Sequence, residues 1–452
     1  MDGFSIGAII SLVALAIVVI ISCVKEDLNP GFLGICFALF VGAVWTDMNA
    51  SRVLSLFPTS LFMTLAGITF LFAMAQNNGT LEKFTTNSIR MVKGNTAYIP
   101  FVMFFLMSFI TAIGPGNIAT IALMAPVCMP IAERIGIRAF LMTLIVAGAV
   151  QGTAFSPFAP TGIISNQLIA KMAPQLPELT QQMTLDALGW KVFWNSFIVQ
   201  GVVNMGGFLA LGGWSWIMKQ RHSNFSIDEI APKPEPYNRK QVITLVTIGA
   251  MIVMVLLPGM PGIKEILPKW FINLTNNVGG VAFLLAGIMM LLETADVRAS
   301  VKSMPWNVLM LVCGVTVLIG VMDKAGGLNA MVKLIGAVSN PVSINGWLGL
   351  FTGIISAYAS SSGVVMPMFL PLVPGLIKEI GGGNPVALIS SINVGSHLVD
   401  TSPLSTMGAL CIACAGESEN KTKLFRDLLI WGLSMAIVGA VACWVFYGIL
   451  GL

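Results

Sequence analysis

Long apolar stretches alternate with short polar segments along the whole chain. A helix needs about 20 consecutive apolar residues to cross a bilayer core of about 30 Å. Lipid offers the backbone no hydrogen-bond partner, so each stretch is expected to be helical. Ten crossings are predicted, at 4–24, 30–47, 57–76, 138–172, 189–218, 240–257, 278–293, 304–323, 384–416 and 423–450, of which 138–172 and 384–416 contain a polar break.

Two further apolar stretches, 97–131 and 345–378, are too long for one span and carry a polar break midway. The first break is 114–117 (Gly-Pro-Gly-Asn) and the second is 360–363 (Ser-Ser-Ser-Gly). Each stretch is predicted to form a re-entrant hairpin, which enters and leaves the membrane on the same side. The expected fold class is therefore an all-α integral membrane protein with ten transmembrane helices plus two re-entrant hairpins.

Composition and charge agree with a membrane protein. Of 452 residues, 56% are hydrophobic and 10% are charged, against about 25% charged in a typical soluble chain. The net charge of +4 comes from Lys and Arg in short segments between spans, without the clustered basic face of a nucleic-acid-binding protein. With the N-terminus outside, 16 of the 24 Lys and Arg are cytoplasmic. This bias predicts a multi-pass protein of the inner (plasma) membrane with N- and C-termini extracytoplasmic.

The two halves of the chain match at a nearly constant offset. Four pairs of motifs recur in the same order, 245 to 247 residues apart. They are Pro58 with Gly67-Ile68-Thr69 against Pro305 with Gly314-Val315-Thr316, Gly79 against Gly326, Pro126 against Pro371, and Ser156-Pro157 against Ser402-Pro403. We predict an N-terminal repeat at 1–218 with five spans and a cytoplasmic hairpin, a cytoplasmic linker at 219–239, and a C-terminal repeat at 240–452 with five spans and an extracytoplasmic hairpin.

An odd number of crossings per half means that the second half is inverted relative to the first. Inverted repeats with broken helices are the architecture of many secondary transporters, whose sites lie near the midplane between the repeats. A duplicated membrane scaffold without transport is the alternative. A scaffold does not need matched helix breaks at membrane depth, where unpaired backbone is costly unless it lines a cavity.

The hairpin tips carry groups suited to small ions. Amides at the start of the half-helix near Asn117 attract anions, and the Asn117 side chain offers both a carbonyl and an NH2 group. In the second tip, Ser361 and Ser362 precede a glycine and can cap a helix or bind a carboxylate. The broken spans add hydroxyls beside prolines, which free an upstream carbonyl; these are Thr153, Ser156 and Thr161 in the first and Thr401 and Ser402 in the second.

Asp400 is the acid predicted to lie deepest in the membrane. An intramembrane carboxylate is costly and is a functional hypothesis by default, here as a cation ligand or a proton carrier. His397, one turn earlier, either tunes that proton or is a hydrogen-bonded structural residue. No Lys or Arg falls within a hairpin tip or a span break. An anionic substrate is therefore expected to be neutralised by helix termini, hydroxyls and a co-bound cation, which couples the two binding events.

These paired hairpins and broken helices resemble the ion transporter superfamily, which includes the divalent anion–sodium symporters, and within it the dicarboxylate and malonate carriers of the MatC type. The resemblance extends over essentially the whole chain. It implies inverted repeats, a homodimer, elevator-like movement of a hairpin-bearing domain and a Ser-Asn-Thr motif at each tip. That motif falls on 116–118 and 361–363, where Asn117 and Ser361 keep the family residue.

The resemblance also implies sodium sites between each hairpin tip and its broken helix. The cation-binding candidates are Gly116, Asn117, Thr153, Ser156, Ser362, Gly363, Asp400 and Thr401. The substrate-binding candidates are Asn117, Ser156, Thr161, Ser361, Ser362 and Ser402. An acid in this stretch departs from the dicarboxylate branch of the family, so proton coupling is the alternative to sodium. No resident cofactor and no other metal is expected.

The sequence thus predicts a sodium- or proton-coupled secondary symporter of a small dicarboxylate such as malonate, succinate or malate, and not an enzyme. Its expected partners are that anion, sodium or a proton, membrane lipid and a second copy of the chain, but no nucleic acid. Three alternatives stay open: a carrier of another anion (citrate, a monocarboxylate or arsenite), an ion channel, and a membrane enzyme built on a Ser and His397 pair.

Overall fold

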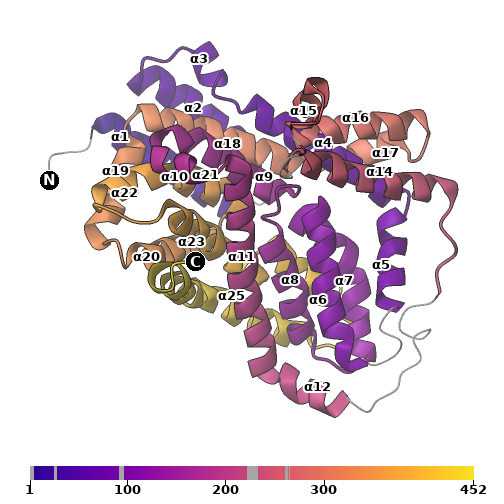
Figure 1. Cartoon of the computed structure of the whole chain (residues 1–452). Helices are drawn as coiled ribbons and strands as arrows, with labels where there is room; N and C mark the ends of the chain where they lie inside the picture. The colour runs from indigo at the N-terminus through magenta and orange to yellow at the C-terminus, as the bar shows by residue number, and fades with distance from the viewer. Residues whose placement is uncertain (1–4, 25–27, 91–95, 221–232, 260–262, 264) are drawn as a thin grey trace.

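The computed structural model describes residues 5–24, 28–90, 96–220, 233–259, 263 and 265–452, and every regular element in these ranges is a helix (Figure 1). The first half of the chain holds α1 (Ile6–Val24), α2 (Pro30–Trp45), α3 (Ala50–Leu54), α4 (Thr59–Asn77), α5 (Thr80–Arg90), α6 (Ile99–Ile113), α7 (Gly116–Arg134), α8 (Ala139–Thr153), α9 (Pro160–Met172), α10 (Pro177–Gln182), α11 (Leu185–Phe208) and α12 (Trp214–Gln220). Most of the predicted linker, 221–232, lies outside the described residues.

The second half holds α14 (Arg239–Leu256), α15 (Lys269–Thr275), α16 (Val278–Leu291), α17 (Val297–Lys302), α18 (Trp306–Lys324), α19 (Gly327–Val338), α20 (Ile344–Ser356), α21 (Met366–Phe369), α22 (Val373–Glu379), α23 (Pro385–Leu398), α24 (Thr406–Ala413) and α25 (Lys421–Cys443). Among the described residues, eight helices are long and apolar enough to cross a membrane, and a bent pair makes nine. That pair is α15 and α16, which meet at 95°. The predicted span at 278–293 matches α16, but α15 was not predicted.

Both predicted broken spans are pairs of short helices. The first is interrupted between Thr153, where α8 ends, and Pro160, where α9 begins. The second is interrupted between α23 and α24, where a short turn, η7 (Val399–Thr401), follows α23 directly. Proline cannot donate a backbone hydrogen bond and disfavours helical backbone in the residue before it, so the Ser-Pro pairs at 156–157 and 402–403 end the helices locally.

The two predicted hairpins also have their tips where the polar breaks stand. Helix α6 ends at Ile113 and α7 begins at Gly116. Between them Gly114 has a φ of +150°, and Gly116 has a φ of +79°, a region that residues with a Cβ atom rarely adopt. A Cβ atom on Gly114 would lie 1.8 Å from the Phe72 ring of α4. Glycine is therefore needed here both for the turn and for the close approach to α4.

The return limb of the second hairpin is less regular. It starts as a π-helical turn, η5 (Ser361–Val365), and reaches α22 through short segments. Three prolines at 367, 371 and 374 remove backbone donors along this limb. The first hairpin also has two prolines in its return limb, Pro126 and Pro130, but α7 continues through both.

Backbone details recur in the two halves. Among the described residues, the non-glycine residues with positive φ are Asp47 (51°) and Glu293 (49°), 246 positions apart. Two or three residues later, Asn49 caps α3 and Asp296 caps α17. Positive φ is uncommon outside glycine and costs conformational energy. Its recurrence at matched positions agrees with the duplication predicted from the sequence motifs.

Two helix crossings join the halves, and they are reciprocal. Helix α2 packs against α18, and α4 packs against α16 (Figure 1). At the first crossing, a Cβ atom on Gly314 would lie 2.0 Å from the carbonyl oxygen of Gly31. At the second, a Cβ atom on Gly67 would lie 2.3 Å from the carbonyl oxygen of Gly279. Small residues that let backbones touch are typical of interfaces between membrane helices.

Candidate functional site

Two cavities meet at the hairpin tips. The first has a volume of about 250 Å³ and lies between α4, the start of α7, the start of α9 and the start of α18. The second, of about 960 Å³, lies beside the second hairpin tip and the segment from Asp400 to Ala413. Asn117, Ile118 and Ser362 line both cavities. The wall between the cavities is thus built from the two tips that the polar breaks predicted.

Three helix N-termini converge on the first cavity. They belong to α7, α9 and α18, and their N-cap residues Pro115, Ala159 and Pro305 form no side-chain cap. The first four amides of a helix have no partner within the helix, and they carry partial positive charge that attracts anions. Within the described residues, neither cavity is lined by Lys or Arg. Some of these amides have partners, since Gly162 donates to the Ala154 carbonyl and Trp306 to the Met304 carbonyl. The positive potential of the first cavity therefore comes from the remaining backbone amides.

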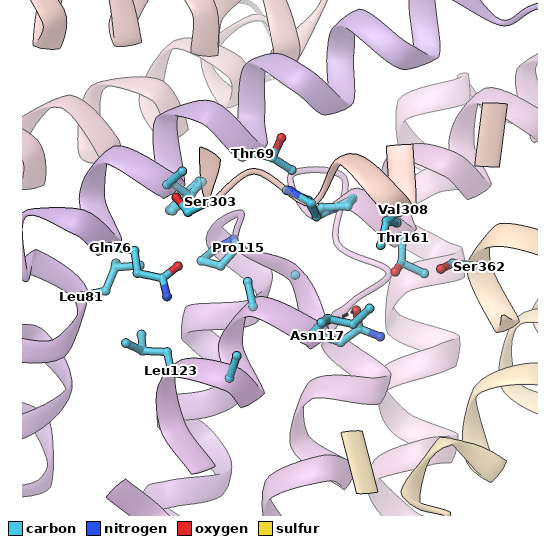
Figure 2. Close-up of a pocket in the computed structure, with 18 of the residues that line it drawn as sticks. Thr69, Gln76, Leu81, Pro115, Asn117, Leu123, Thr161, Ser303, Val308 and Ser362 are labelled. Atoms are coloured by element: carbon cyan, nitrogen blue, oxygen red, sulfur yellow. Dashed lines mark hydrogen bonds between the residues drawn. The ribbon is translucent and has the colours of Figure 1, made fainter. Parts of the chain in front are cut away.

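Polar side chains line the first cavity on more than one side. Figure 2 shows Asn117, Thr161 and Ser362 toward one side and Gln76 and Leu81 toward the other. The Asn117 side-chain oxygen accepts a hydrogen bond of 3.0 Å from the amide of Ile118. Apolar residues line much of the remainder: Phe72, Ala73, Ala122, Leu123, Ile164 and Val308. Pockets for drug-sized ligands begin at about 300 Å³, so this cavity suits a smaller organic anion.

A hydrogen-bonded chain of three side chains borders the second cavity. The Ser361 hydroxyl oxygen lies 2.7 Å from each carboxyl oxygen of Asp400 and 2.7 Å from the Ser356 hydroxyl oxygen. Asp400 is 7% exposed and belongs to η7, whereas Ser361 begins the return limb of the second hairpin. The contact therefore joins the second tip to the second broken span through Ser361.

In the first broken span, Thr153 and Ser156 use their hydroxyls to hold backbone. Thr153 donates to the carbonyl of Ala149 over 2.6 Å, within α8. Ser156 donates to the carbonyl of Ala112 over 2.6 Å, which ties the break to the end of α6. Neither residue lines either cavity. In this conformation Ser156 stabilises the first tip and Thr153 bonds within its own helix, whereas the sequence predicts that both contact ligands.

The remaining predicted residues have similar structural contacts. Ser402 accepts a hydrogen bond from the Leu404 amide at 3.2 Å, and Thr401 donates to the Leu398 carbonyl at 3.5 Å. The Gly363 amide donates to the Ser360 hydroxyl at 3.1 Å. Gly116, by contrast, lines the first cavity. Predicted residues brought together at the cavities are Gly116, Asn117, Thr161, Ser361, Ser362 and Asp400; those outside both linings are Thr153, Ser156, Gly363, Thr401 and Ser402.

His397 lies among structural contacts. Its Nδ1 atom is 3.0 Å from the Asn393 carbonyl oxygen and 2.9 Å from the Ser396 hydroxyl oxygen. Its ring meets the Phe155 ring edge-on, with the centroids 4.7 Å apart. His397 lines neither cavity. These contacts favour the structural alternative for this residue.

Sequence reasoning missed the wall that α4 and the start of α18 contribute. Thr69, Gln76 and Ser303 line the first cavity, opposite the first hairpin tip. The sequence contained a signal for this wall, since the duplicated motifs include Thr69 and Pro305. Those motifs were interpreted as evidence for duplication, and nothing local in them shows that they face a hairpin far away in the sequence.

An all-helical chain with multiple membrane spans and polar cavities at paired helix breaks has the architecture of a secondary carrier. Residues 6–154 match the family model described as the N-terminus of the dicarboxylate carrier protein MatC. This match confirms the resemblance to MatC-type carriers over that part of the chain, and the matched family is one of carriers and not of enzymes.

The fold is similar to that of a solved transporter. The crystal structure of the YdaH transporter of Alcanivorax borkumensis superposes with a TM-score of 0.56 and 14% sequence identity, covering 93% of this chain and 98% of that chain. At this sequence identity, the similarity shows a common fold and nothing further. No curated protein matches the chain. The protein is thus a multi-pass helical membrane protein whose fold is similar to that of this transporter.

Proposed function

We propose that the protein is a cation-coupled secondary symporter of small dicarboxylates, such as malonate, succinate or malate, that works by elevator-type alternating access. The observation that carries this proposal is the first cavity, where three helix N-termini without a side-chain N-cap surround a small space bordered by Asn117, Thr161 and Ser362. Backbone amides at helix N-termini bind carboxylates. The dicarboxylate class is supported by the description of the family that matches residues 6–154.

The proposed architecture comprises ten crossings and two re-entrant hairpins, arranged as inverted repeats at 1–218 and 240–452. The matched positive φ angles of Asp47 and Glu293 and the reciprocal glycine crossings support the duplication. The distribution of Lys and Arg supports extracytoplasmic termini in the plasma membrane. The homodimer and the elevator movement are proposed from the resemblance to the superfamily.

The role proposed for each residue depends on the cavity that it lines. Asn117, Thr161 and Ser362 bind the substrate carboxylates, and Asp400 with Ser361 forms the cation-binding group. The other predicted residues stabilise the backbone of the tips and of the broken spans around these groups: Gly116, Thr153, Ser156, Gly363, Thr401 and Ser402.

Counterflow in proteoliposomes tests this function. Vesicles that contain the full chain and unlabelled malonate or succinate are expected to take up the labelled acid from outside, with sodium or protons equal on both sides. Competition by malate, citrate, acetate and arsenite then defines the substrate class. Exchange of citrate, acetate or arsenite without exchange of any dicarboxylate would reject the proposed substrate.

A Ser362→Ala substitution is expected to reduce dicarboxylate counterflow by about tenfold. The residue lines both cavities, and a hydrogen bond to a charged group contributes about 1.5–3 kcal/mol. Counterflow at several malonate concentrations gives KM and the maximal rate. The matched control is Ser339→Ala, whose hydroxyl donates to the Ile335 carbonyl at the end of α19. If the two variants have the same KM and maximal rate, Ser362 does not bind the substrate.

A Ser156→Ala substitution is expected to act on stability instead. It leaves the Ala112 carbonyl without its hydroxyl donor, and loss of a buried partner costs about 1–3 kcal/mol. The melting temperature in detergent should fall relative to Ser339→Ala, while the malonate KM of the folded protein is retained. A raised KM with an unchanged melting temperature would show instead that Ser156 binds the substrate, as the sequence predicts.

A further inference from the structure

We propose that Gln76 of α4 binds the second carboxylate of the substrate and thereby selects acids with two negative charges over acids with one. This inference rests on the proposed function and deepens it, because a second carboxylate requires a dicarboxylate in the first cavity. Three observations carry it: polar groups at two ends of that cavity, a Gln76 carboxamide without a hydrogen bond in the described protein, and contacts that fix the backbone around it.

The first cavity has polar groups at two ends. Figure 2 shows Asn117, Thr161 and Ser362 at one end and Gln76 at the other, with the carboxamide of Gln76 directed into the space. Most of the remaining lining is apolar. A dicarboxylate has the same distribution, with a carboxylate at each end of a short carbon chain. One carboxylate at the hairpin tips therefore leaves the other for the end formed by α4.

The cavity is small enough for one acid to contact both ends. Its volume of about 250 Å³ is below the range of pockets for drug-sized ligands, which begins at about 300 Å³. Thr69 and Gln76 line it from α4, and the seven residues between their positions extend over about 10 Å of helix. A ligand that fills this space thus contacts α4 as well as the tips.

The second carboxylate needs a hydrogen-bond donor at this end. Among the described residues that line the first cavity, none is Asp, Glu, Lys or Arg. A carboxylate that leaves water without a partner is strongly destabilised. The start of α18 lies at the same end, where Ser303 and Pro305 line the cavity, and the Gln76 side chain supplies an NH2 group with two donor hydrogens. Gln76 can therefore replace the water that a second carboxylate loses.

The other polar side chains of this wall are already bound within the protein. The Thr69 hydroxyl donates to a carbonyl of its own helix at 2.8 Å. The Ser303 hydroxyl donates to a backbone carbonyl at 3.0 Å and accepts from Asn77 at 3.0 Å. The carboxamide of Gln76 forms no hydrogen bond with any residue that the structure describes. It is the side chain of this wall that is left for a ligand.

The next two carboxamides in the sequence have structural contacts instead. Asn77 donates to the Ser303 hydroxyl at 3.0 Å, and Asn78 donates to the Thr244 hydroxyl at 2.7 Å. Both partners belong to the second half of the chain, so these bonds fix the end of α4 against it. Gln76 therefore extends from an anchored backbone, and a group that is held in place before binding loses less conformational freedom when the ligand binds.

The carbonyl end of α4 is partly neutralised beside Gln76. Unpaired carbonyls at the last turn of a helix repel anions. Here the Asn78 amide donates to the Met74 carbonyl at 3.1 Å, and the Gly79 amide donates to the Gln76 carbonyl at 3.0 Å. These bonds occupy carbonyls that would otherwise point toward a bound anion. The end of α4 is thereby compatible with a carboxylate at the Gln76 side chain.

Competition of counterflow separates acids with two charges from acids with one. Proteoliposomes of the full chain exchange labelled malonate while succinate or monomethyl succinate competes, at about pH 8, where free carboxyl groups are ionised. The competitors share a carbon chain, but the ester lacks one charge. The preference is the half-inhibitory concentration of the ester divided by that of succinate. In Gln76→Leu this ratio should fall by about tenfold, because a hydrogen bond to a charged group is lost.

Two further substitutions vary the charge at this position. Gln76→Glu places a negative charge beside the second carboxylate and should lower the preference below that of Gln76→Leu. Gln76→Lys supplies an ammonium group and should keep or exceed the wild-type preference. A merely structural role of Gln76 would not order the variants by charge. The control is Gln175→Glu, an exposed glutamine of η2 (Ala173–Gln175) outside both cavity linings, which should keep the wild-type preference.

The outcomes separate this inference from the proposed function. If the wild type, Gln76→Leu and Gln76→Glu have the same preference, Gln76 does not bind the second carboxylate. A wild type that exchanges malonate but binds the ester as well as succinate would also overturn the inference, and it would leave the carrier function intact. Absence of wild-type counterflow for every dicarboxylate would instead reject the proposed function.

Thermal stabilisation measures the same preference without transport. A ligand that binds the folded protein raises its melting temperature. In detergent, succinate should raise the melting temperature of the wild type more than the ester does at the same concentration, and this difference should disappear in Gln76→Leu. The measurement decides the question for a variant that folds but exchanges no substrate. A difference that persists in Gln76→Leu would overturn the inference.

Discussion

An Asn117→Ala protein should exchange dicarboxylates at least about tenfold more slowly than the wild type, the largest loss expected for one polar side chain of the site. Asn117 stands in the first turn of α7, which has no side-chain N-cap from Pro115, and lines both cavities. Its side chain is placed to bind a carboxylate next to the amides of α7. Hydrogen bonds to charged groups contribute about 1.5–3 kcal/mol, and 1.4 kcal/mol corresponds to a factor of ten.

Counterflow of labelled malonate gives KM and the maximal rate for this variant. The matched control is Asn87→Ala, an exposed asparagine on α5 that binds the Tyr237 hydroxyl. Wild-type kinetics in Asn117→Ala would show that the first cavity is not the anion site.

A second substitution at the same position distinguishes an anion from a cation. Asn117→Asp keeps the size of the side chain but adds a negative charge at the junction of the cavities. If the first cavity binds the carboxylate, this variant should be more impaired than Asn117→Ala, because like charges repel within a low-dielectric site. Better transport by Asn117→Asp than by Asn117→Ala would mean that a cation occupies this position.

A Gly314→Ala substitution should cause the largest loss of stability among single small changes. The added Cβ atom would lie 2.0 Å from the carbonyl oxygen of Gly31, so α2 and α18 must move apart. Overpacking costs about 1–3 kcal/mol and occasionally more, and here the obstacle is backbone that cannot change rotamer. A clear fall in the melting temperature of the detergent-solubilised protein is the expected result.

The chain offers matched controls for this measurement. A Cβ atom on Gly249 of α14 or on Gly287 of α16 would meet no atom within 4 Å, so alanine at either position should leave the melting temperature unchanged or raise it, since glycine is unfavourable in helices. Gly279→Ala tests the reciprocal crossing, where the new atom would lie 2.3 Å from Thr64. If Gly314→Ala melts together with the controls, the close crossing of α2 and α18 does not stabilise the fold.

The sequence by itself determined the positions of most long helices and of their breaks, although not of α15. Spans predicted at 57–76 and 240–257 correspond to α4 (Thr59–Asn77) and α14 (Arg239–Leu256). The tip at 114–117 was equally predictable, because glycine and proline act on the backbone within one or two turns. Asn117 and Ser362 are candidate site residues for the same reason: each stands at a break inside an apolar stretch.

Only the tertiary structure decided what each polar group contacts. Ser156 and Ser361 are both hydroxyls beside a break, but the first donates to the Ala112 carbonyl and the second contacts Asp400. Their partners lie 44 and 39 residues away, beyond the reach of any local pattern. The contribution of α4 to the first cavity was likewise set by packing between distant helices. Hydropathy and backbone restrictions act locally, whereas the use of a hydroxyl for structure or for a site depends on which helix packs beside it.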